Sequence, residues 1–456
     1  MKDVYGLIGV GNRGGLIVET EIFLLAAAPI AVLLIMLLLL RQSVLRAAAF
    51  GLLLAVCSGL SGFDGTWAQS LAACLKGIKD SLPIIAVVFV TLFLYAWAEK
   101  SGALRRLQDV LVSCSADTAV QALLLGWLFV HALQGVSGFG VPVLVGAPLL
   151  VKIGLSPFRA VLIALLGQCW GNTFGTLGLA WNGLLTQVTL TNGEAMAAMT
   201  AASSYLVIVC VLTGFMIAWL AAGFAGLCRT FWLVLVLGLL QGEGQTLLSY
   251  WSPEMANFLA SLLGLGGFFF WQKAFSYRQR SAETHLSETG EKQTAAVLIL
   301  WQKDFLPAFA RYACKRTWPV AAAIMLLLAM SEVMVTAGET KVLAFGMAEI
   351  TGPHYLAAAP FVGLLGSFMT ASNLSSNILF ASFQQQMAVF LGLSAEELLA
   401  LQTAGGAVGT LLSPSNIFLG TTAVGIVGAE GKILHWTLAA ALFFCALFSL
   451  LSYVVN

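Results

Sequence analysis

The chain has 456 residues, of which 59% are hydrophobic and only 9% are charged, and its formal net charge is +1. A soluble domain carries about 25% charged residues, so this composition excludes a water-soluble globular protein and predicts an exterior that faces lipid. The near-zero net charge gives no reason to expect a nucleic-acid partner, and the eight cysteines form no CxxC pair of the kind found in zinc or redox sites.

The apolar segments are continuous and do not alternate with polar residues, which predicts membrane-spanning helices and not the strands of a barrel. Crossing the hydrocarbon core takes about 20 helical residues. About ten transmembrane helices are predicted on this criterion: residues 23–40, 47–60, 82–98, 158–185, 195–222, 230–248, 256–271, 318–336, 398–425 and 434–455.

Four of the apolar stretches are interrupted by polar and glycine residues. Stretches 118–151 and 355–391 are broken halfway, and we interpret each as a re-entrant hairpin that enters and leaves the membrane on one side. Spans 158–185 and 398–425 are interpreted as interrupted helices. The fold class predicted from the sequence is thus an all-α polytopic membrane protein.

The positive-inside rule predicts the orientation of this layout. With the N-terminus outside, all but five of the 22 lysines and arginines fall on the inside, which predicts periplasmic N- and C-termini in a bacterial inner membrane. Lys76 and Lys79 fit least well and are expected on an interfacial helix. The five basic residues left outside are Lys2, Arg13, Lys76, Lys79 and Lys341.

The two halves of the chain resemble each other. Leu82-Pro83 recurs as Trp318-Pro319, and Gly154-Leu155-Ser156 recurs as Gly392-Leu393-Ser394. We therefore predict two repeats, residues 1–225 and 226–456, joined through a cytoplasmic linker at 273–316. Five spans in each half would make the repeats inverted, which is typical of secondary transporters with a site near the midplane. The alternative is that glycine-rich membrane helices match by chance.

The four breaks are the predicted binding site. Backbone that leaves the helix at membrane depth is tolerated where it is buried in protein or lines a cavity, and freed helix N-termini suit an anion. The alternative for any one small polar residue is helix–helix packing. The candidate substrate-binding residues are Ser137, Gly138, Gly140, Gln168, Asn172, Thr173, Ser372, Asn373, Ser375, Ser376, Asn377, Thr410, Ser413, Ser415 and Asn416.

Ionisable residues at membrane depth are functional candidates because they are expensive to bury there. His131 precedes the first hairpin tip and is the first candidate for a proton carrier, although a hydrogen-bonded structural histidine fits equally well. Glu332 is a further candidate that could instead reach the interface. No metal cluster, catalytic triad or paired carboxylates appear at membrane depth, so neither an enzyme nor a cofactor is expected.

Three segments carry a resemblance to the L-lactate permease family: residues 135–142 (GVSGFGVP), 366–380 (GSFMTASNLSSNILF) and 404–416 (AGGAVGTLLSPSN). The resemblance implies a proton-coupled permease for lactate or glycolate, with a fold similar to the ion-transporter superfamily. Where that family commonly has charged residues, this chain has the neutral Gln134, Asn373 and Thr410. Gln134 cannot titrate, so either His131 takes its role in ion coupling, or Na⁺ replaces H⁺ as the coupling ion, or the substrate differs.

The function predicted from the sequence is cation symport of a small organic anion such as lactate or glycolate, by a protein that could form a homodimer in the bilayer. One alternative is a channel-like facilitator, because the same breaks could line a pore. Another is a carrier for a different small organic anion.

Overall fold

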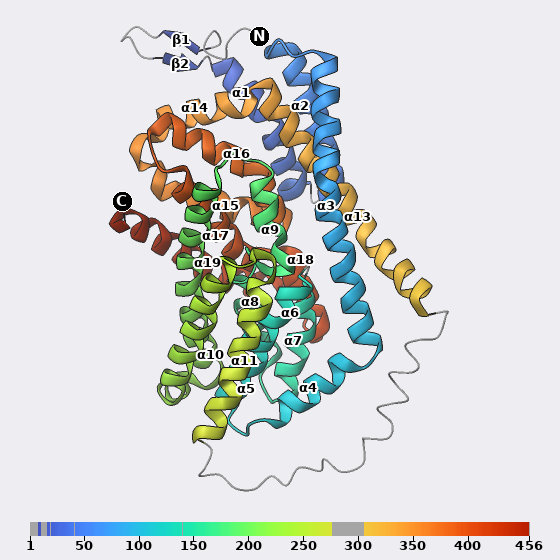
Figure 1. Cartoon of the computed structure of the whole chain (residues 1–456), viewed down its shortest axis with the longest axis vertical. Coiled ribbons are helices and arrows are strands. Elements are labelled where there is room, and N and C mark those ends of the chain that lie inside the picture. The colour runs from blue at the N-terminus through green and yellow to red at the C-terminus, as the bar shows by residue number, and fades with distance from the viewer. Residues whose placement is uncertain are drawn as a thin grey trace.

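The computed structural model describes residues 8–10, 16–18, 20–40, 42–138, 140–275 and 305–455, and nearly all of this part of the chain is helical (Figure 1). Near its start, β1 (Ile8–Val10) pairs antiparallel with β2 (Leu16–Val18). Eight helices in the described ranges are long and apolar enough to cross a membrane. The helical membrane class is therefore confirmed. The predicted linker at 273–316 lies mostly outside the described residues.

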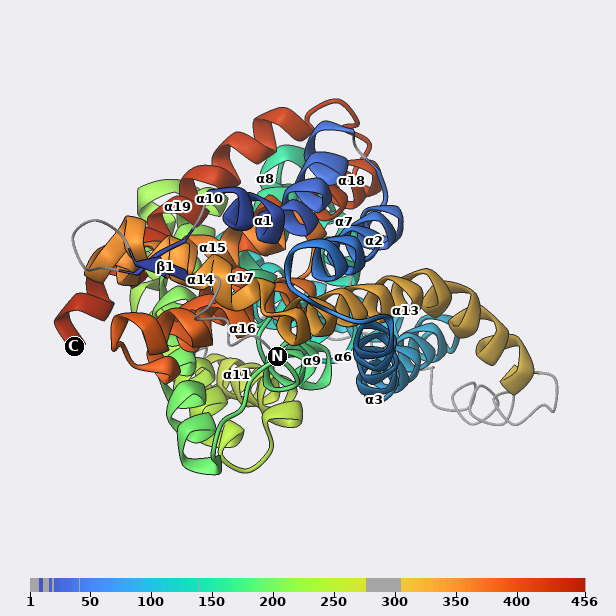
Figure 2. The same cartoon turned by 90° about the horizontal axis from the view of Figure 1, so that it is seen from above.

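One flank of the molecule is a bundle of long helices, which we call the wall bundle. It comprises α1 (Thr20–Leu34) with its π-helical extension η2 (Ile35–Leu39), α2 (Val44–Gly62), α3 (Trp67–Lys100) and α13 (Phe305–Ala337). Figures 1 and 2 both show α3 and α13 side by side, and this is the most extensive helix pair of the fold. A Cβ atom at Gly77 of α3 would lie 2.6 Å from the backbone nitrogen of Ala329 in α13, so a glycine permits this close approach.

The predicted span 82–98 begins much earlier in the structure than the sequence indicated. It is part of α3, a single helix that starts at Trp67 and is capped by the Thr66 side chain. Lys76 and Lys79 therefore lie on the same helix as the span, and their expected position at the membrane interface stays a prediction. Lys76 faces α13, where its Nζ is 2.8 Å from a carboxylate oxygen of Glu332.

The second body, which we call the site bundle, contains both predicted hairpins and both interrupted helices. The first hairpin has one arm made of α5 (Thr118–Leu123), η3 (Leu124–Phe129) and α6 (Val130–Val136), and α7 (Val141–Lys152) is its other arm. The second hairpin is α15 (Tyr355–Thr370) and α16 (Asn373–Leu391). The interrupted helices are α8 (Pro157–Cys169) with α9 (Gly175–Leu185), and α17 (Ala395–Gly409) with η6 (Thr410–Leu412) and α18 (Pro414–Ala423). Each predicted break coincides with a helix interruption.

Three further long elements surround the site bundle: α10 (Asn192–Ser249), α11 (Pro253–Phe275) and α19 (Glu430–Val455). The predicted spans 195–222 and 230–248 are the two arms of α10, which folds back at Gly223 (φ 64°, ψ −161°). The arms run antiparallel, because Gly238 packs against Val211 and Gly242 against Val207.

Two short helices connect the bodies, and each follows a glycine in left-handed conformation. Helix α4 (Ala103–Ser113) follows Gly102 with φ 72°, and α14 (Glu339–Thr351) follows Gly338 with φ 91°. A short 3₁₀ turn, η5 (Gly352–His354), then leads from α14 into α15.

Helix boundaries recur at fixed distances along the chain. Helices α8 and α17 begin 238 residues apart, and so do α10 and α19, while α4 and α14 begin 236 residues apart. A close backbone contact recurs too: a Cβ at Gly167 would lie 1.8 Å from the Gly126 carbonyl oxygen, and one at Gly405 would lie 2.0 Å from that of Pro360. These correspondences are what the predicted repeat requires, whereas the opposite orientation of the halves stays a prediction.

Candidate functional site

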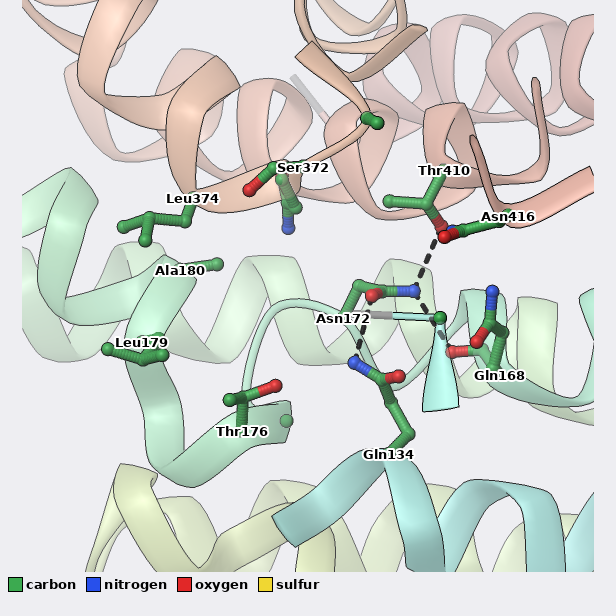
Figure 3. Close-up of a pocket in the computed structure, with 14 residues that line it drawn as sticks. Gln134, Gln168, Asn172, Thr176, Leu179, Ala180, Ser372, Leu374, Thr410 and Asn416 are labelled. Carbon is green, nitrogen blue, oxygen red and sulfur yellow. Dashed lines mark hydrogen bonds between the residues drawn. The ribbon is translucent and has the colours of Figure 1, made fainter. Parts of the chain in front are cut away.

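The four helix interruptions meet around one cavity of about 50 Å³ (Figure 3). The space corresponds to about four water molecules, since one water needs roughly 10–15 Å³ on this measure. Side chains from both hairpins and both interrupted helices form its wall. They are Gln134, Gly140, Gln168, Asn172, Gly175, Thr176, Leu179, Ala180, Ala371, Ser372, Asn373, Leu374, Thr410 and Asn416.

Local sequence signals start three helices at this cavity. Helix α7 follows Gly140, which has the left-handed φ of 80° that glycine adopts without strain. The Ser372 hydroxyl accepts the backbone N–H of Ser375 at 3.3 Å and caps α16. The Ser413 hydroxyl accepts that of Asn416 at 3.2 Å and caps α18, whose first residue is Pro414.

Gly140, the N-cap residue of α7, contributes to the cavity wall together with the first turns of α16 and α18. A helix N-terminus carries unpaired N–H groups and a partial positive charge, so three of them together favour an anionic ligand. No lysine, arginine or histidine is among the residues that line the cavity. The arrangement can therefore attract a carboxylate without a formal positive charge.

A chain of side-chain hydrogen bonds crosses the cavity between the two halves. Gln134 Nε2 donates to Asn172 Oδ1 at 2.9 Å, and Asn172 Nδ2 donates to Thr410 Oγ1 at 2.9 Å (Figure 3). Asn172 Nδ2 also donates to the Gln168 carbonyl oxygen at 3.0 Å. The buried Gln168 Oε1 has no hydrogen-bond partner in the described part of the chain, which leaves an acceptor beside the cavity.

A second polar cluster holds the tip of the second hairpin. Asn377 Nδ2 donates to the Ala180 carbonyl oxygen at 2.8 Å and to Thr403 Oγ1 at 2.9 Å. Asn373 Nδ2 reaches Thr173 Oγ1 at 3.3 Å. Residues of the first interrupted helix are thus bonded directly to the second hairpin, so the two halves share one polar core at the site.

The candidate residues divide into those that line the cavity and those that support it. Gly140, Gln168, Asn172, Ser372, Asn373, Thr410 and Asn416 line it, and so does Gln134 from the ion-coupling set. Thr173 and Asn377 belong to the polar cluster at the tip of the second hairpin, and Ser413 caps α18. Ser137 donates to the Leu133 carbonyl oxygen at 2.6 Å, and Ser376 to that of Gly363 at 2.8 Å. At Gly138, an added Cβ would meet Thr176 Oγ1 at 2.1 Å, so a side chain there would collide with the cavity wall.

A larger cavity of about 370 Å³ adjoins the first and shares Ala371, Ser372, Leu374 and Asn416 with it. Candidates Ser375 and Ser415 line this second space. Its opposite wall belongs to the wall bundle, namely the start of α2 at Ser43–Leu45 and the α13 residues Pro319, Val320, Ala323 and Ile324. The small cavity therefore opens between the two bodies, next to the first turn of α2.

The three ion-coupling candidates do not gather at one place. Gln134 lines the cavity, whereas Glu332 lies in α13 of the wall bundle and pairs with Lys76. His131 is fully buried one turn before Gln134, and its Nε2 is 3.0 Å from Asn257 Nδ2. Its ring stacks on Trp170 with centroids 3.5 Å apart. This environment matches the alternative stated for His131, a hydrogen-bonded structural histidine.

Several residues at the site were not singled out from the sequence. Thr176, Leu179 and Ala180 line the cavity from the first five residues after the break in the first interrupted helix, and Leu374 lies inside the second hairpin break between the candidates Asn373 and Ser375. Asn257 of α11 bonds to His131 and to the carbonyl oxygen of Gly171 at 3.3 Å. It is one of several polar residues in α11, so the sequence offered no signal for that contact.

The family model described as L-lactate permease matches residues 22–306 and 294–456. The chain is 24% identical to the L-lactate permease of Halalkalibacterium halodurans over 94% of this chain and 96% of that protein. It is 24% identical to the L-lactate permease of Escherichia coli (strain K12) over 92% and 93%, respectively. The glycolate permease GlcA of the same strain is 23% identical over 94% of each chain.

Proposed function

This chain belongs to the L-lactate permease family, and we propose that it moves a small monocarboxylate such as lactate or glycolate across the inner membrane by cation symport. Membership makes it a multi-pass membrane permease for small carboxylates. The symport mechanism, the individual substrate and the binding residues are the proposal. They rest on the cavity at the four helix interruptions.

The observation that carries the proposal is the meeting of three helix N-termini at a neutral, polar cavity of small volume. A carboxylate bound there would accept N–H groups at the starts of α16 and α18. The space of about 50 Å³ suits a molecule of a few heavy atoms and is too small for a long-chain acid.

The remaining walls suit the other two parts of a 2-hydroxy acid. The amide and hydroxyl groups of Gln134, Asn172 and Thr410 offer donors and acceptors for the 2-hydroxyl group. Leu179, Ala180 and Leu374 form an apolar side on which a methyl group would pack. Lactate would contact the helix N-termini with its carboxylate, the amide and hydroxyl groups with its 2-hydroxyl group, and the apolar side with its methyl group. Glycolate, which has no methyl group, would make only the first two contacts.

Two inverted repeats would place this site on their common axis, with residues 1–225 forming one repeat and 226–456 the other. The recurring helix boundaries support this division. The second cavity reaches Ser43, close to Arg46, which the positive-inside rule puts on the cytoplasmic side. We therefore propose that the conformation described is open to the cytoplasm. A homodimer is compatible with the family but is not needed to complete the site.

The test is transport by purified protein in proteoliposomes. Preloaded vesicles should show saturable counterflow of labelled L-lactate and glycolate, and an imposed gradient of H⁺ or Na⁺ should drive accumulation above equilibrium. Lactamide, which lacks the charge, should not compete. Flux without counterflow would instead support the channel-like alternative, and the absence of both for every small 2-hydroxymonocarboxylate would refute the proposed substrate class.

A further inference from the structure

The first residue of α14, Glu339, carries a carboxyl group that is fully buried outside the spanning helices. The Ser58 hydroxyl of α2 donates to Glu339 Oε1 at 2.6 Å. Glu339 Oε2 has no hydrogen-bond partner among the described residues. Burial raises the pKa of this carboxyl to about 8, and the Ser58 hydrogen bond opposes that rise only in part. The group is therefore protonated at neutral pH.

No charged group compensates Glu339 within the described part of the chain, where the ion pairs are Lys76–Glu332, Lys152–Asp109 and Arg229–Asp117. Helix α14 packs against α1, α13, α16, β2 and η5. Neither α16 nor β2 carries an acidic, basic or histidine residue. The charged residues and histidines of α14, the other packed elements, α2 and the loop after α2 can be named from the sequence. They are Glu21, Arg46, Asp64, Glu332 with its partner Lys76, Lys341, Glu349 and His354, together with Arg311, Lys315 and Arg316 at the start of α13.

A polar cavity of about 630 Å³ lies beside the backbone of Glu339, whose buried side chain is not part of its wall. Gly338 and Thr340, the two neighbours of Glu339 in the chain, line it, together with Lys341. Its other walls come from the loop after α2 at Asp64–Thr66 and from Gln385 and Gln386 of α16. The Glu339 carboxyl would reach water in this cavity by leaving its buried position at Ser58. The cavity shares no lining residue with the proposed substrate cavity, so the two are separate spaces.

Helix α14 is linked to the substrate cavity through α16, against which it packs. It lies between two glycines in left-handed conformation, Gly338 (φ 91°) and Gly352 (φ 52°). It packs along α16, where the rings of Phe345 and Phe390 meet edge to face at 5.2 Å. The opposite end of α16 contributes Asn373 and Leu374 to the substrate cavity. A displacement of α14 would therefore move a wall of that cavity.

We propose that Glu339 is the site of the coupling proton: the neutral acid docks on Ser58, and when it leaves Ser58 it releases H⁺ to water in the polar cavity and shifts α14 with α16. The physical reason is that a buried carboxylate with one hydrogen bond and no cation is too costly to keep in place. The inference rests on the proposed symport and names its ion as H⁺.

The matched test compares Glu339→Gln with Glu349→Gln, an exposed glutamate on the same helix. Glu339→Gln keeps a neutral side chain in the docked position. In proteoliposomes it should retain lactate counterflow and lose accumulation driven by a pH gradient, whereas Glu349→Gln should keep both. Accumulation by Glu339→Gln at the wild-type level would overturn the proposal.

A second readout does not depend on lactate. Infrared difference spectra of the purified wild-type protein should contain a protonated-carboxyl band that disappears as the pH rises through about 8. The band should be absent in Glu339→Gln and present in Glu349→Gln. If wild-type protein transports no carboxylate, the proposed function fails but this measurement still decides the proton site. A titrating band that persists in Glu339→Gln would overturn it.

A third variant, Ser58→Ala, covers the case in which Glu339→Gln does not fold. Ser58→Ala keeps the carboxyl and removes the hydrogen bond that lowers its pKa. The titration of the infrared band should therefore shift to higher pH. An unchanged titration would show that the band belongs to another group and would refute the assignment.

Discussion

Asn172 and Thr410 lie 238 positions apart in the chain and share a direct hydrogen bond of 2.9 Å between the Asn172 amide and the Thr410 hydroxyl. The same distance separates the first residues of α8 and α17. In the proposed repeat, these two residues are therefore equivalent positions, and their bond joins the two breaks directly.

Thr410→Val should weaken substrate binding. Valine keeps the shape of threonine but removes one acceptor of the Asn172 amide, which keeps its bond to the Gln168 carbonyl oxygen. The loss of one hydrogen bond costs about 0.5–1.5 kcal/mol. We expect the apparent KM for lactate to rise about tenfold, which corresponds to roughly 1.4 kcal/mol. Thr410→Ser restores the hydroxyl and should transport nearly as well as wild type. Initial-rate kinetics in proteoliposomes measure both, and equal kinetics for all three proteins would contradict the role of this bond.

Gly140→Ala should abolish transport by crowding the cavity. A Cβ atom there would lie 2.6 Å from Leu419 Cδ1 and 2.9 Å from Asn416 Oδ1, in a backbone with φ 80°. Gly154→Ala is the matched control, because Gly154 has φ 96° and a Cβ atom added there would meet nothing within 4 Å. Both variants carry backbone strain of about 1–2 kcal/mol, so only the loss of transport in Gly140→Ala reports on the cavity. Equal activity of the two would move the site elsewhere.

His131→Phe and Asn257→Leu should lower transport without changing its pH dependence. The 3.0 Å contact between His131 and Asn257 and the bond from Asn257 to Gly171 fix the backbone next to Asn172. Each substitution disrupts the same group of contacts among His131, Asn257 and Gly171, so transport by the double variant should be little lower than by either single variant. Lactate uptake measured across a pH series tests this. A pH profile that flattens only in His131→Phe would instead identify His131 as a proton carrier.

Lys76→Met should destabilise the wall bundle. The Glu332 side chain is only 6% exposed and would lose the ammonium group 2.8 Å away. Because the Lys76 side chain is 62% exposed, we expect a loss of about 1–2 kcal/mol and not the larger cost of a fully buried pair. Thermal unfolding in detergent should show this loss.

Two further variants test the assignment of the Lys76–Glu332 pair to stability. Lys79→Met, an exposed lysine of the same helix, should not change the unfolding temperature. Glu332→Gln should retain accumulation driven by an ion gradient. If Glu332→Gln is stable but loses that accumulation, Glu332 belongs to ion coupling after all.

The helix interruptions were predictable because local chemistry causes them. Gly140, Ser372 and Ser413 start helices at the site through glycine backbone freedom or a side-chain cap, and each of these signals is contained in a few neighbouring residues. The sequence thus located the four segments that surround the cavity, and it also suggested the distance at which they recur.

The remaining features depend on contacts between distant segments. Asn257 meets His131 across 126 positions, and Ser58 meets Glu339 across 281. Neither pair has a sequence pattern, because each depends on how helices pack in space. The early start of α3 has the same origin: Gly77 allows α3 to lie against the backbone of α13, and this packing keeps Lys76 and Lys79 within one helix.

The small volume of the substrate cavity has a consequence for the ion that enters it. A carboxylate in bulk water is surrounded by several ordered solvent molecules, and a space of about 50 Å³ has no room for ligand and shell together. The carboxylate must lose its hydration water before it binds among the fixed dipoles of α7, α16 and α18. Selectivity among anions would then depend on their free energy of dehydration as much as on their shape. It would favour weakly hydrated anions over small, strongly hydrated anions of equal charge.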